Sequence, residues 1–238
     1  MKNNKEIANL FKQTKHPDDL SDFYHLYNSS NVLNAIYWWE YFREISFHEI
    51  DGDIVECGVG RGRSLITLAT INNYISSAND VEKRRIFALD SFEGFPEPTS
   101  FDVSTRNPKK GEWSSSPNNQ FEYSPDALQT VLKKAGLNED IIFIKGFFKE
   151  TTKNLSIERI SILHLDGDLY ESIRDPLNNL WSKVSLGGVI VLDDYLFKGE
   201  ESESFPGARK AVMDFLEENS SFKYLESLRG TPYLKRIT

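Results

Sequence analysis

The 238-residue sequence predicts an α/β fold with a mainly parallel sheet and helices on both faces. Two apolar runs, residues 162–168 and 188–194, each stop abruptly at carboxylates. Similar short apolar runs alternate with helix-like segments along most of the chain. A continuous apolar run is typical of a strand buried on both faces, as in a parallel sheet. Since ligands bind outside the carboxyl ends of parallel strands, we expect these acids to share one edge of the sheet.

The other elements follow from local patterns. The predicted strands are 53–57, 85–90, 141–145 and the two apolar runs above. The predicted helices are 31–45, 64–74, 124–136, 171–184 and 206–217. The helix at 124–136 has a plausible N-cap in Ser124, a proline at its first position and Gly136 at its end. Strands that alternate with helices in this way favour right-handed crossovers and a parallel sheet.

The chain divides into an N-terminal helical extension, residues 1–50, and an α/β domain, residues 51–238. The aromatic helix of the extension is expected to pack on the domain, with a lid or a subunit contact as alternatives. A stretch at 96–124, rich in Ser, Asn, Pro, Lys and Gly, interrupts the alternation. A loop of this length is usually functional or disordered, so it predicts either a mobile cover over the site or simple surface disorder.

The composition limits the possible partners. The net charge of -8 and the pI of about 5.1 argue against non-specific binding to nucleic acid or an anionic membrane, which are both negative. The single cysteine, Cys57, cannot form an intrachain disulfide. No apolar run approaches the length of a transmembrane helix. We therefore expect a cytoplasmic protein.

A glycine-rich turn follows the first predicted strand, with glycines at 58, 60 and 62. Such a turn lets the backbone approach a ligand, and the next helix offers free N–H groups. The dinucleotide fingerprint would need glycine where this chain has Arg63, which disfavours a nicotinamide-dependent oxidoreductase. Asp90 ends the second predicted strand, where its carboxylate is placed to accept hydrogen bonds from both ribose hydroxyls of a nucleoside.

The acids of the two apolar runs form a candidate metal site. Asp166, Asp193 and Asp194 offer the hard oxygen ligands that Mg²⁺ and Ca²⁺ prefer. Asp168 instead suits the N-cap of the following helix. A rival interpretation is a haloacid-dehalogenase-like phosphatase, whose D-x-D motif resembles residues 166–168. That motif normally follows the first strand, however, and here it follows the fourth.

Several ordered motifs resemble the macrocin O-methyltransferase family. The matching stretches are DIVECGVGRG at 53–62, LDSFEGFPEP at 89–98, KGFFKET at 145–151, LHLDGDLYES at 163–172 and LGGVIVLDDY at 186–195, with a weaker match at 205–215. The resemblance covers about residues 50–215. It implies a class I Rossmann-like methyltransferase fold, S-adenosylmethionine as the methyl donor, dependence on Mg²⁺, and a sugar hydroxyl of a glycosylated natural product as the acceptor.

The resemblance also implies roles for individual residues. The predicted metal ligands are Asp166, Asp193 and Asp194. Asp166 is also the predicted base, because a ligand carboxylate lies next to the hydroxyl that it must deprotonate. The predicted cofactor-binding residues are Glu56, Gly58, Gly60, Asp90, Ser91, Gly146 and Phe147.

The chain departs from relatives at two points. Gly60 stands where many relatives have a bulky residue, and no histidine follows His164 that could act as a C-terminal base. His164 itself is expected to be a core or supporting residue. A non-catalytic nucleoside-binding protein on the same fold stays open as an alternative, and the family habit favours a homo-oligomer.

Overall fold

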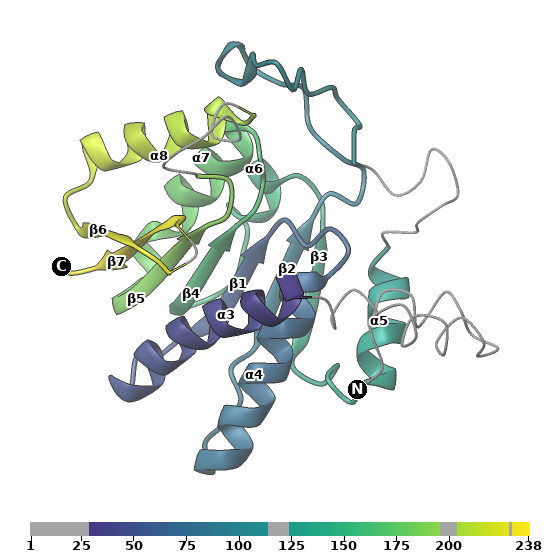
Figure 1. Cartoon of the computed structure of the whole chain (residues 1–238), viewed down its shortest axis with the longest axis vertical. Coiled ribbons are helices and arrows are strands. Elements are labelled where there is room, and N and C mark those ends of the chain that lie inside the picture. The colour runs from purple at the N-terminus through teal and green to yellow at the C-terminus, as the bar shows by residue number, and fades with distance from the viewer. Residues whose placement is uncertain (1–28, 114–123, 196–203, 229) are drawn as a thin grey trace.

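The computed structural model describes residues 29–113, 124–195, 204–228 and 230–238. Its sheet has seven strands in the order β3-β2-β1-β4-β5-β7-β6 (Figure 1). The strands are β1 (Asp53–Cys57), β2 (Ile86–Asp90), β3 (Ile141–Lys145), β4 (Ile160–Leu165), β5 (Val184–Leu192), β6 (Phe222–Glu226) and β7 (Pro232–Arg236). Strands β1 to β5 pair in parallel, whereas β7 is antiparallel to β5 and to β6. The predicted mainly parallel α/β fold is confirmed.

Helices cover both faces of this sheet (Figure 1). One face packs against α3 (Ser29–Phe47), α4 (Arg63–Asn79) and α5 (Pro125–Lys134). The other packs against α6 (Phe148–Thr151), α7 (Tyr170–Leu180) and α8 (Pro206–Glu218). Short 3₁₀ turns, η1 (Ser100–Asp102) and η2 (Trp181–Lys183), complete the described elements. Each crossover helix therefore brings the next strand back to the same edge of the sheet.

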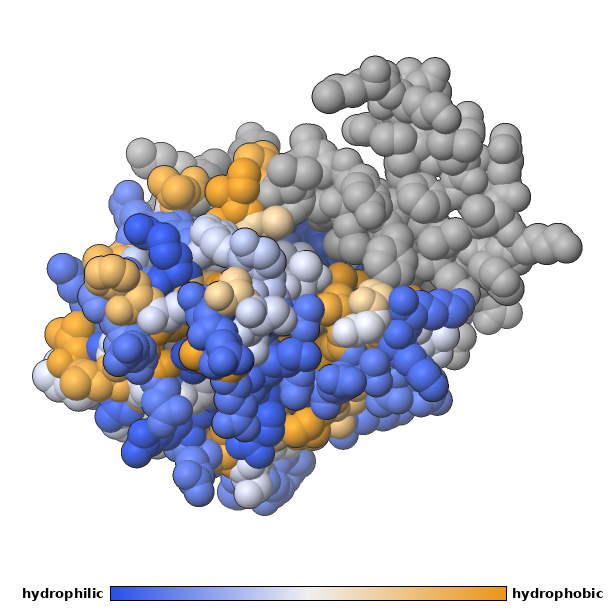
Figure 2. All heavy atoms as spheres, turned by 90° about the horizontal axis from the view of Figure 1, so that it is seen from below, coloured by the Kyte–Doolittle hydropathy of each residue, from blue (hydrophilic) through white to orange (hydrophobic). Residues whose placement is uncertain are grey.

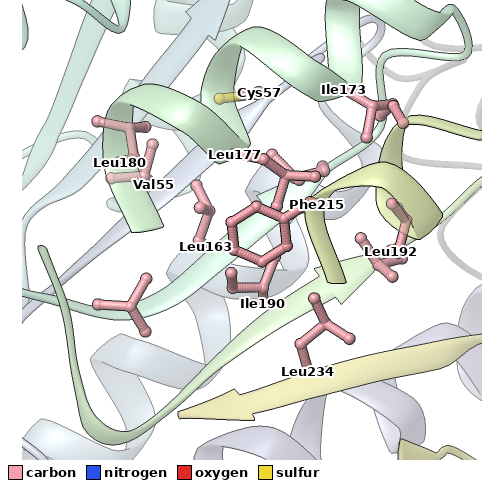
Figure 3. Close-up of a cluster of buried hydrophobic side chains, with 14 of the residues drawn as sticks. Val55, Cys57, Leu163, Ile173, Leu177, Leu180, Ile190, Leu192, Phe215 and Leu234 are labelled. Atoms are coloured by element: carbon pink, nitrogen blue, oxygen red, sulfur yellow. The ribbon is translucent and has the colours of Figure 1, made fainter. Parts of the chain in front are cut away.

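Two apolar cores form between the sheet and these helices. Figure 3 shows the core beside α7 and α8, where Leu163 and Ile190 of the sheet lie close to Leu177 and Phe215. These side chains are almost fully buried, and the strands supply them at alternate positions. The intervening residues, such as Ile162 and Val191, point to the second core under α3 and α4. Burial on both faces explains why the central strands have continuous apolar sequences.

Helix α3 packs on the domain, as expected from its sequence. Trp38, Tyr41, Phe42 and Ile45 are all buried against the second core. Aromatic edge-to-face contacts order this cluster, with the rings of Trp38 and Tyr41 5.8 Å apart. The prediction that the extension as a whole is helical also involves residues 1–28, which lie outside the described residues.

The sequence analysis missed the two C-terminal strands. In β6 and β7 only some side chains are buried, among them Phe222 and Leu234. Because β6 is the last strand of the sheet, it lacks the continuous apolar run that identifies the central strands. Strand β5 is also longer than predicted, and begins at Val184 where we expected the end of a helix.

Part of the stretch expected to be a mobile cover or simple surface disorder, residues 96–113, is anchored by hydrogen bonds in the structure, and whether it moves stays a prediction. Gly111 N donates to Phe95 O at 2.9 Å, and Phe95 N donates to Glu112 O at 2.9 Å. Asp102 is 2% exposed, and its Oδ1 accepts a hydrogen bond from Tyr170 N at 2.7 Å. Ser104 Oγ donates to Ser204 O at 2.9 Å. The segment is therefore tied to the starts of α7 and α8, while residues 114–123 lie outside the described part.

Among the described residues, no helix is both long enough and apolar enough to span a membrane. The face seen in Figure 2 is mostly hydrophilic, and its apolar patches are small and separated by polar side chains. This distribution agrees with the low mean hydropathy of the sequence, -0.46.

Candidate active site

A cavity of about 1000 Å³ lies at the carboxyl ends of β1, β2, β3 and β4. Six of the predicted site residues line it: Gly58, Gly60, Asp90, Ser91, Phe147 and Asp166. The structure thus brings together the glycine turn, the acid after β2 and one acid of the candidate metal site. This is the edge of a parallel sheet at which ligands are expected.

The glycine turn is shaped by close packing between β1 and β4. Gly58 has φ +98, and a Cβ atom there would lie 1.7 Å from the carbonyl oxygen of Asp166. Only glycine fits this position. At Gly60, with φ +49, a Cβ atom would meet nothing within 4 Å. The glycine turn leads directly into α4, whose first residues, Arg63 and Ser64, line the cavity. The N-terminus of this helix therefore faces the cavity.

Asp90 fastens this turn to the end of β2. Its Oδ2 accepts hydrogen bonds from Val59 N at 2.9 Å and Gly60 N at 3.0 Å. Its Oδ1 accepts one from Phe92 N at 2.7 Å. A carboxylate has about four acceptor positions, so contacts to the backbone leave capacity for a ligand hydroxyl. The residue predicted to hold the ribose therefore also sets the shape of the turn.

Three other predicted cofactor-binding residues, Ser91, Gly146 and Phe147, differ in how they relate to the cavity. Ser91 Oγ donates to Gly94 O at 2.8 Å and accepts from Glu93 N, so it closes its own turn. Gly146 N donates to Asp90 O at 2.9 Å but does not line the cavity. Phe147 lines the cavity and is 38% exposed, which offers an aromatic face at the end of β3.

Glu56 lies behind the turn rather than in the cavity wall. Its side chain is fully buried, and its Oε1 lies 3.1 Å from Nδ1 of the equally buried His164. The two residues are direct register partners on β1 and β4. Burial raises the pKa of the Glu56 carboxyl, and the hydrogen bond from His164 opposes that rise. The structure thus gives Glu56 a partner that the sequence analysis did not pair with it.

The carboxylates beyond β4 and β5 fall into two groups. Candidate ligand atoms of His164, Asp166 and Asp193 all lie within 4.8 Å of one another. Asp194 Oδ2 instead accepts a hydrogen bond from Asp168 N at 2.9 Å. Burial raises the pKa of Asp168 to about 7, and the charge of Asp166 adds to the rise. Burial, followed by the charges of Asp168 and Asp193, also raises the pKa of Asp194.

The first group fits a divalent cation. Cation–oxygen distances of about 2.0–2.6 Å allow donor atoms on one ion to be up to about 5 Å apart. The donor atoms of Asp166 and Asp193 meet this requirement. The second group, Asp168 and Asp194, lies beside it and fixes the loop after β4.

Sequence reasoning missed several residues of the cavity wall. Phe95 and Trp113 line it, with ring centroids 6.0 Å apart and an interplanar angle of 17°. Glu171 and Asp175 of α7 also line it, and burial raises the pKa of Asp175. No local pattern marks Trp113. His164 of β4, however, stands two residues before Asp166, which directly follows the strand, and a spacing of two places side chains on one face.

Comparisons with known proteins agree with this geometry. The family model described as Macrocin-O-methyltransferase (TylF) matches residues 38–228, most of the chain. The chain belongs to the macrocin O-methyltransferase family. The family membership expected from the sequence motifs is thereby confirmed, and the relatives are named O-methyltransferases.

The relatives of this family member act on natural products. It is 34% identical over 63% of its length to demethyldecarbamoylnovobiocin O-methyltransferase of Streptomyces niveus, but spans only 55% of that protein. It is 30% identical to mycinamicin III 3''-O-methyltransferase of Micromonospora griseorubida, with 79% of this chain and 69% of that protein covered. It is 33% identical to a tetracenomycin 4'-O-methyltransferase of Streptomyces olivaceus, with 79% of this chain and 67% of that protein covered.

Solved structures support the class I methyltransferase fold of this family member. The O-methyltransferase NovP matches with a TM-score of 0.66 and 28% identity, over 84% of this chain and 77% of that one. The calicheamicin methyltransferase CalS11 matches with a TM-score of 0.73 over 98% and 90% of the chains. Its identity is only 19%, so this second likeness shows the fold alone.

Proposed function

We propose that this chain transfers a methyl group from S-adenosylmethionine to a hydroxyl of a sugar or glycosylated small molecule. The observation that carries the proposal is one cavity in which the glycine turn and Asp90 meet the acid Asp166. Relatives named for methylation of natural products support the acceptor class. A divalent cation, Mg²⁺ in this proposal, would be held by Asp166 and Asp193. Asp194, the third ligand expected from the sequence, would support the site from beside it, where its Oδ2 accepts from Asp168 N.

The two bound groups would supply complementary chemistry. S-adenosylmethionine would supply an electrophilic methyl on a sulfonium, and the cation would act as a Lewis acid that lowers the pKa of the acceptor alcohol. The protein's part is to hold donor and acceptor in line within the cavity. Gly58, Gly60, Asp90 and Ser91 would hold the methionine and ribose ends of the donor, and Phe147 its adenine.

Asp166 is the proposed base. It lines the cavity together with the glycine turn, and the acceptor hydroxyl would lie beside it. As the methyl–sulfur bond breaks and the carbon–oxygen bond forms, the hydroxyl proton passes to the Asp166 carboxylate. Family membership and the position of residues 166–168 after β4 leave the phosphatase alternative without support.

The proposal is tested by a methyl-transfer screen with labelled S-adenosylmethionine against glycosides and nucleotide sugars. We expect transfer that is lost in excess EDTA and in Asp193→Asn, while S-adenosylhomocysteine still binds to the variant in calorimetry. Full activity of Asp193→Asn, or activity unchanged by EDTA, would refute the role of the cation. Failure of the wild type to bind S-adenosylhomocysteine would refute the methyltransferase proposal itself and favour an inert protein on this fold.

We also propose a homo-oligomer that uses the outer face of α3. Leu33, Ile36 and Phe47 are 64%, 56% and 82% exposed on this helix. Apolar side chains grouped on one helix face favour a protein contact. Light scattering on Phe47→Glu would show a smaller particle than the wild type, and an unchanged mass would exclude this face.

A further inference from the structure

The clearest unexplained feature of the site is the buried imidazole of His164. It is fully buried, and its Nε2 makes no hydrogen bond with any described residue. An unpaired polar atom in the protein interior costs free energy unless a ligand or an ordered water satisfies it. The question is therefore what this nitrogen faces.

The sheet register shows which residues lie beside His164. His164 lies opposite Glu56 of β1 and Val191 of β5, so these three residues form one row across the sheet. Asp166 and Asp193 stand two residues further along β4 and β5, on the same face one row closer to the cavity. A candidate ligand atom of His164 lies within 4.8 Å of those of both acids.

The orientation of the ring is fixed from two sides. Nδ1 lies 3.1 Å from Glu56 Oε1. An ionised Glu56 can only accept, and Nδ1 then carries the proton of this hydrogen bond. Nε2 is then the nitrogen with a free lone pair. The indole of Trp38 packs edge-on against the imidazole, with ring centroids 4.7 Å apart and an interplanar angle of 85°.

We propose that His164 is a nitrogen ligand of the divalent cation held by Asp166 and Asp193, and that Glu56 is the positioning residue for its imidazole. A histidine that binds a metal almost always donates its other N–H to a carboxylate or carbonyl, and Glu56 supplies that acceptor here. The inference rests on the proposed function, because it adds a ligand to the cation site of the methyl-transfer reaction. It also gives Glu56 a supporting role behind the cavity.

A mixed nitrogen and oxygen site has a consequence for the choice of metal. Imidazole suits transition metals, whereas Mg²⁺ prefers oxygen ligands alone. We therefore expect Mn²⁺ and Co²⁺ to bind at least about tenfold more tightly than Mg²⁺, following the order of affinity for sites with nitrogen ligands. Calorimetry without S-adenosylmethionine measures this ratio independently of activity.

The decisive experiment detects the nitrogen directly. Bound Mn²⁺ is examined by electron spin-echo spectroscopy in the absence of S-adenosylmethionine, whose own amino group contains nitrogen. The chain has four histidines, so the triple variant His16→Gln, His25→Gln, His48→Gln leaves His164 alone. We expect the ¹⁴N modulation of a coordinated imidazole in the wild type and in this triple variant, and its loss in His164→Gln.

Each result decides the assignment. Bound Mn²⁺ without ¹⁴N modulation in the triple variant would overturn it, and so would modulation that persists in His164→Gln. Because His164 is buried and its replacement can impair folding, the triple variant carries the test with His164 itself unchanged. Methyl transfer and binding of S-adenosylhomocysteine are measured on the same samples. An active enzyme with an all-oxygen Mn²⁺ site would reject His164 as a ligand and leave the methyltransferase proposal standing.

Discussion

Asp102 caps helix α7 from a distant part of the chain, because its Oδ1 accepts a hydrogen bond from Tyr170 N at 2.7 Å. The residue before the helix, Leu169, has no side chain that could do so. The other oxygen, Oδ2, accepts from the backbone and hydroxyl of Thr99. One buried carboxylate thus fixes both the 96–113 segment and the helix that follows the acids of β4.

We expect Asp102→Ala to destabilise the protein by about 2 kcal/mol, because a helix cap is lost and a buried N–H is left unpaired. For a chain of this size that corresponds to a fall in Tm of roughly 4–8 °C. Thermal unfolding measures it. Asp102→Asn keeps an acceptor oxygen and should lose less. Exposed Glu97→Ala in the same segment is the control. Equal Tm values for Asp102→Ala and Glu97→Ala would show that the cap contributes nothing.

The parallel part of the fold was predictable, because its strands are buried on both faces and therefore carry continuous apolar runs. The meeting of Asp166 and Asp193 was predictable for a related reason, since parallel strands end at the same edge. Strands β6 and β7 were not, because partial burial leaves only a short mixed pattern.

Contacts between distant segments also escaped prediction. The place of Trp113 in the cavity depends on how the 96–113 segment is anchored, and the anchoring hydrogen bond joins residues 68 positions apart. The Glu56–His164 pair spans 108 positions and needs the register of β1 and β4. Local periodicity carries no information on either contact.

The two glycines of the turn provide a second prediction. In Gly58→Ala the new Cβ would collide with the backbone of Asp166, so the ends of β1 and β4 must separate. We expect loss of S-adenosylhomocysteine binding and a fall of several °C in Tm. Gly60→Ala meets no atom and should cost only the strain of its positive φ, about 1–2 kcal/mol. Calorimetry and thermal unfolding compare them, and equal losses in both variants would contradict the packing argument.

Asp90 provides a third prediction. Asp90→Asn removes the charge that holds the N–H groups of Val59 and Gly60 and replaces one acceptor oxygen by a donor. Hydrogen bonds to charged groups contribute about 1.5–3 kcal/mol, so the Kd for S-adenosylhomocysteine should rise roughly 10- to 100-fold. Glu93→Gln, at an exposed residue paired with Lys145 at 3.3 Å, is the control and should bind normally. Equal affinity in the two variants would rule out a role of Asp90 in the donor site.

Trp113 provides the last prediction, which concerns the acceptor. Its indole lines the cavity and is 64% exposed, yet it is held from behind by Phe95. The guanidinium of Arg106 lies 5.9 Å from the Trp113 ring and is fixed in turn by Glu112 at 2.6 Å. A large aromatic side chain immobilised at a cavity wall is suited to bind the apolar face of a sugar.

We therefore expect Trp113→Ala to raise the KM for the best acceptor of the glycoside screen about tenfold, in line with the loss of one aromatic contact. The Kd for S-adenosylhomocysteine should change less than about twofold, and Trp113→Phe should retain most of the affinity for the acceptor. Val103→Ala, at a residue 79% exposed in the same segment, is the matched control. Weaker binding of S-adenosylhomocysteine with an unchanged acceptor KM would instead place Trp113 beside the donor.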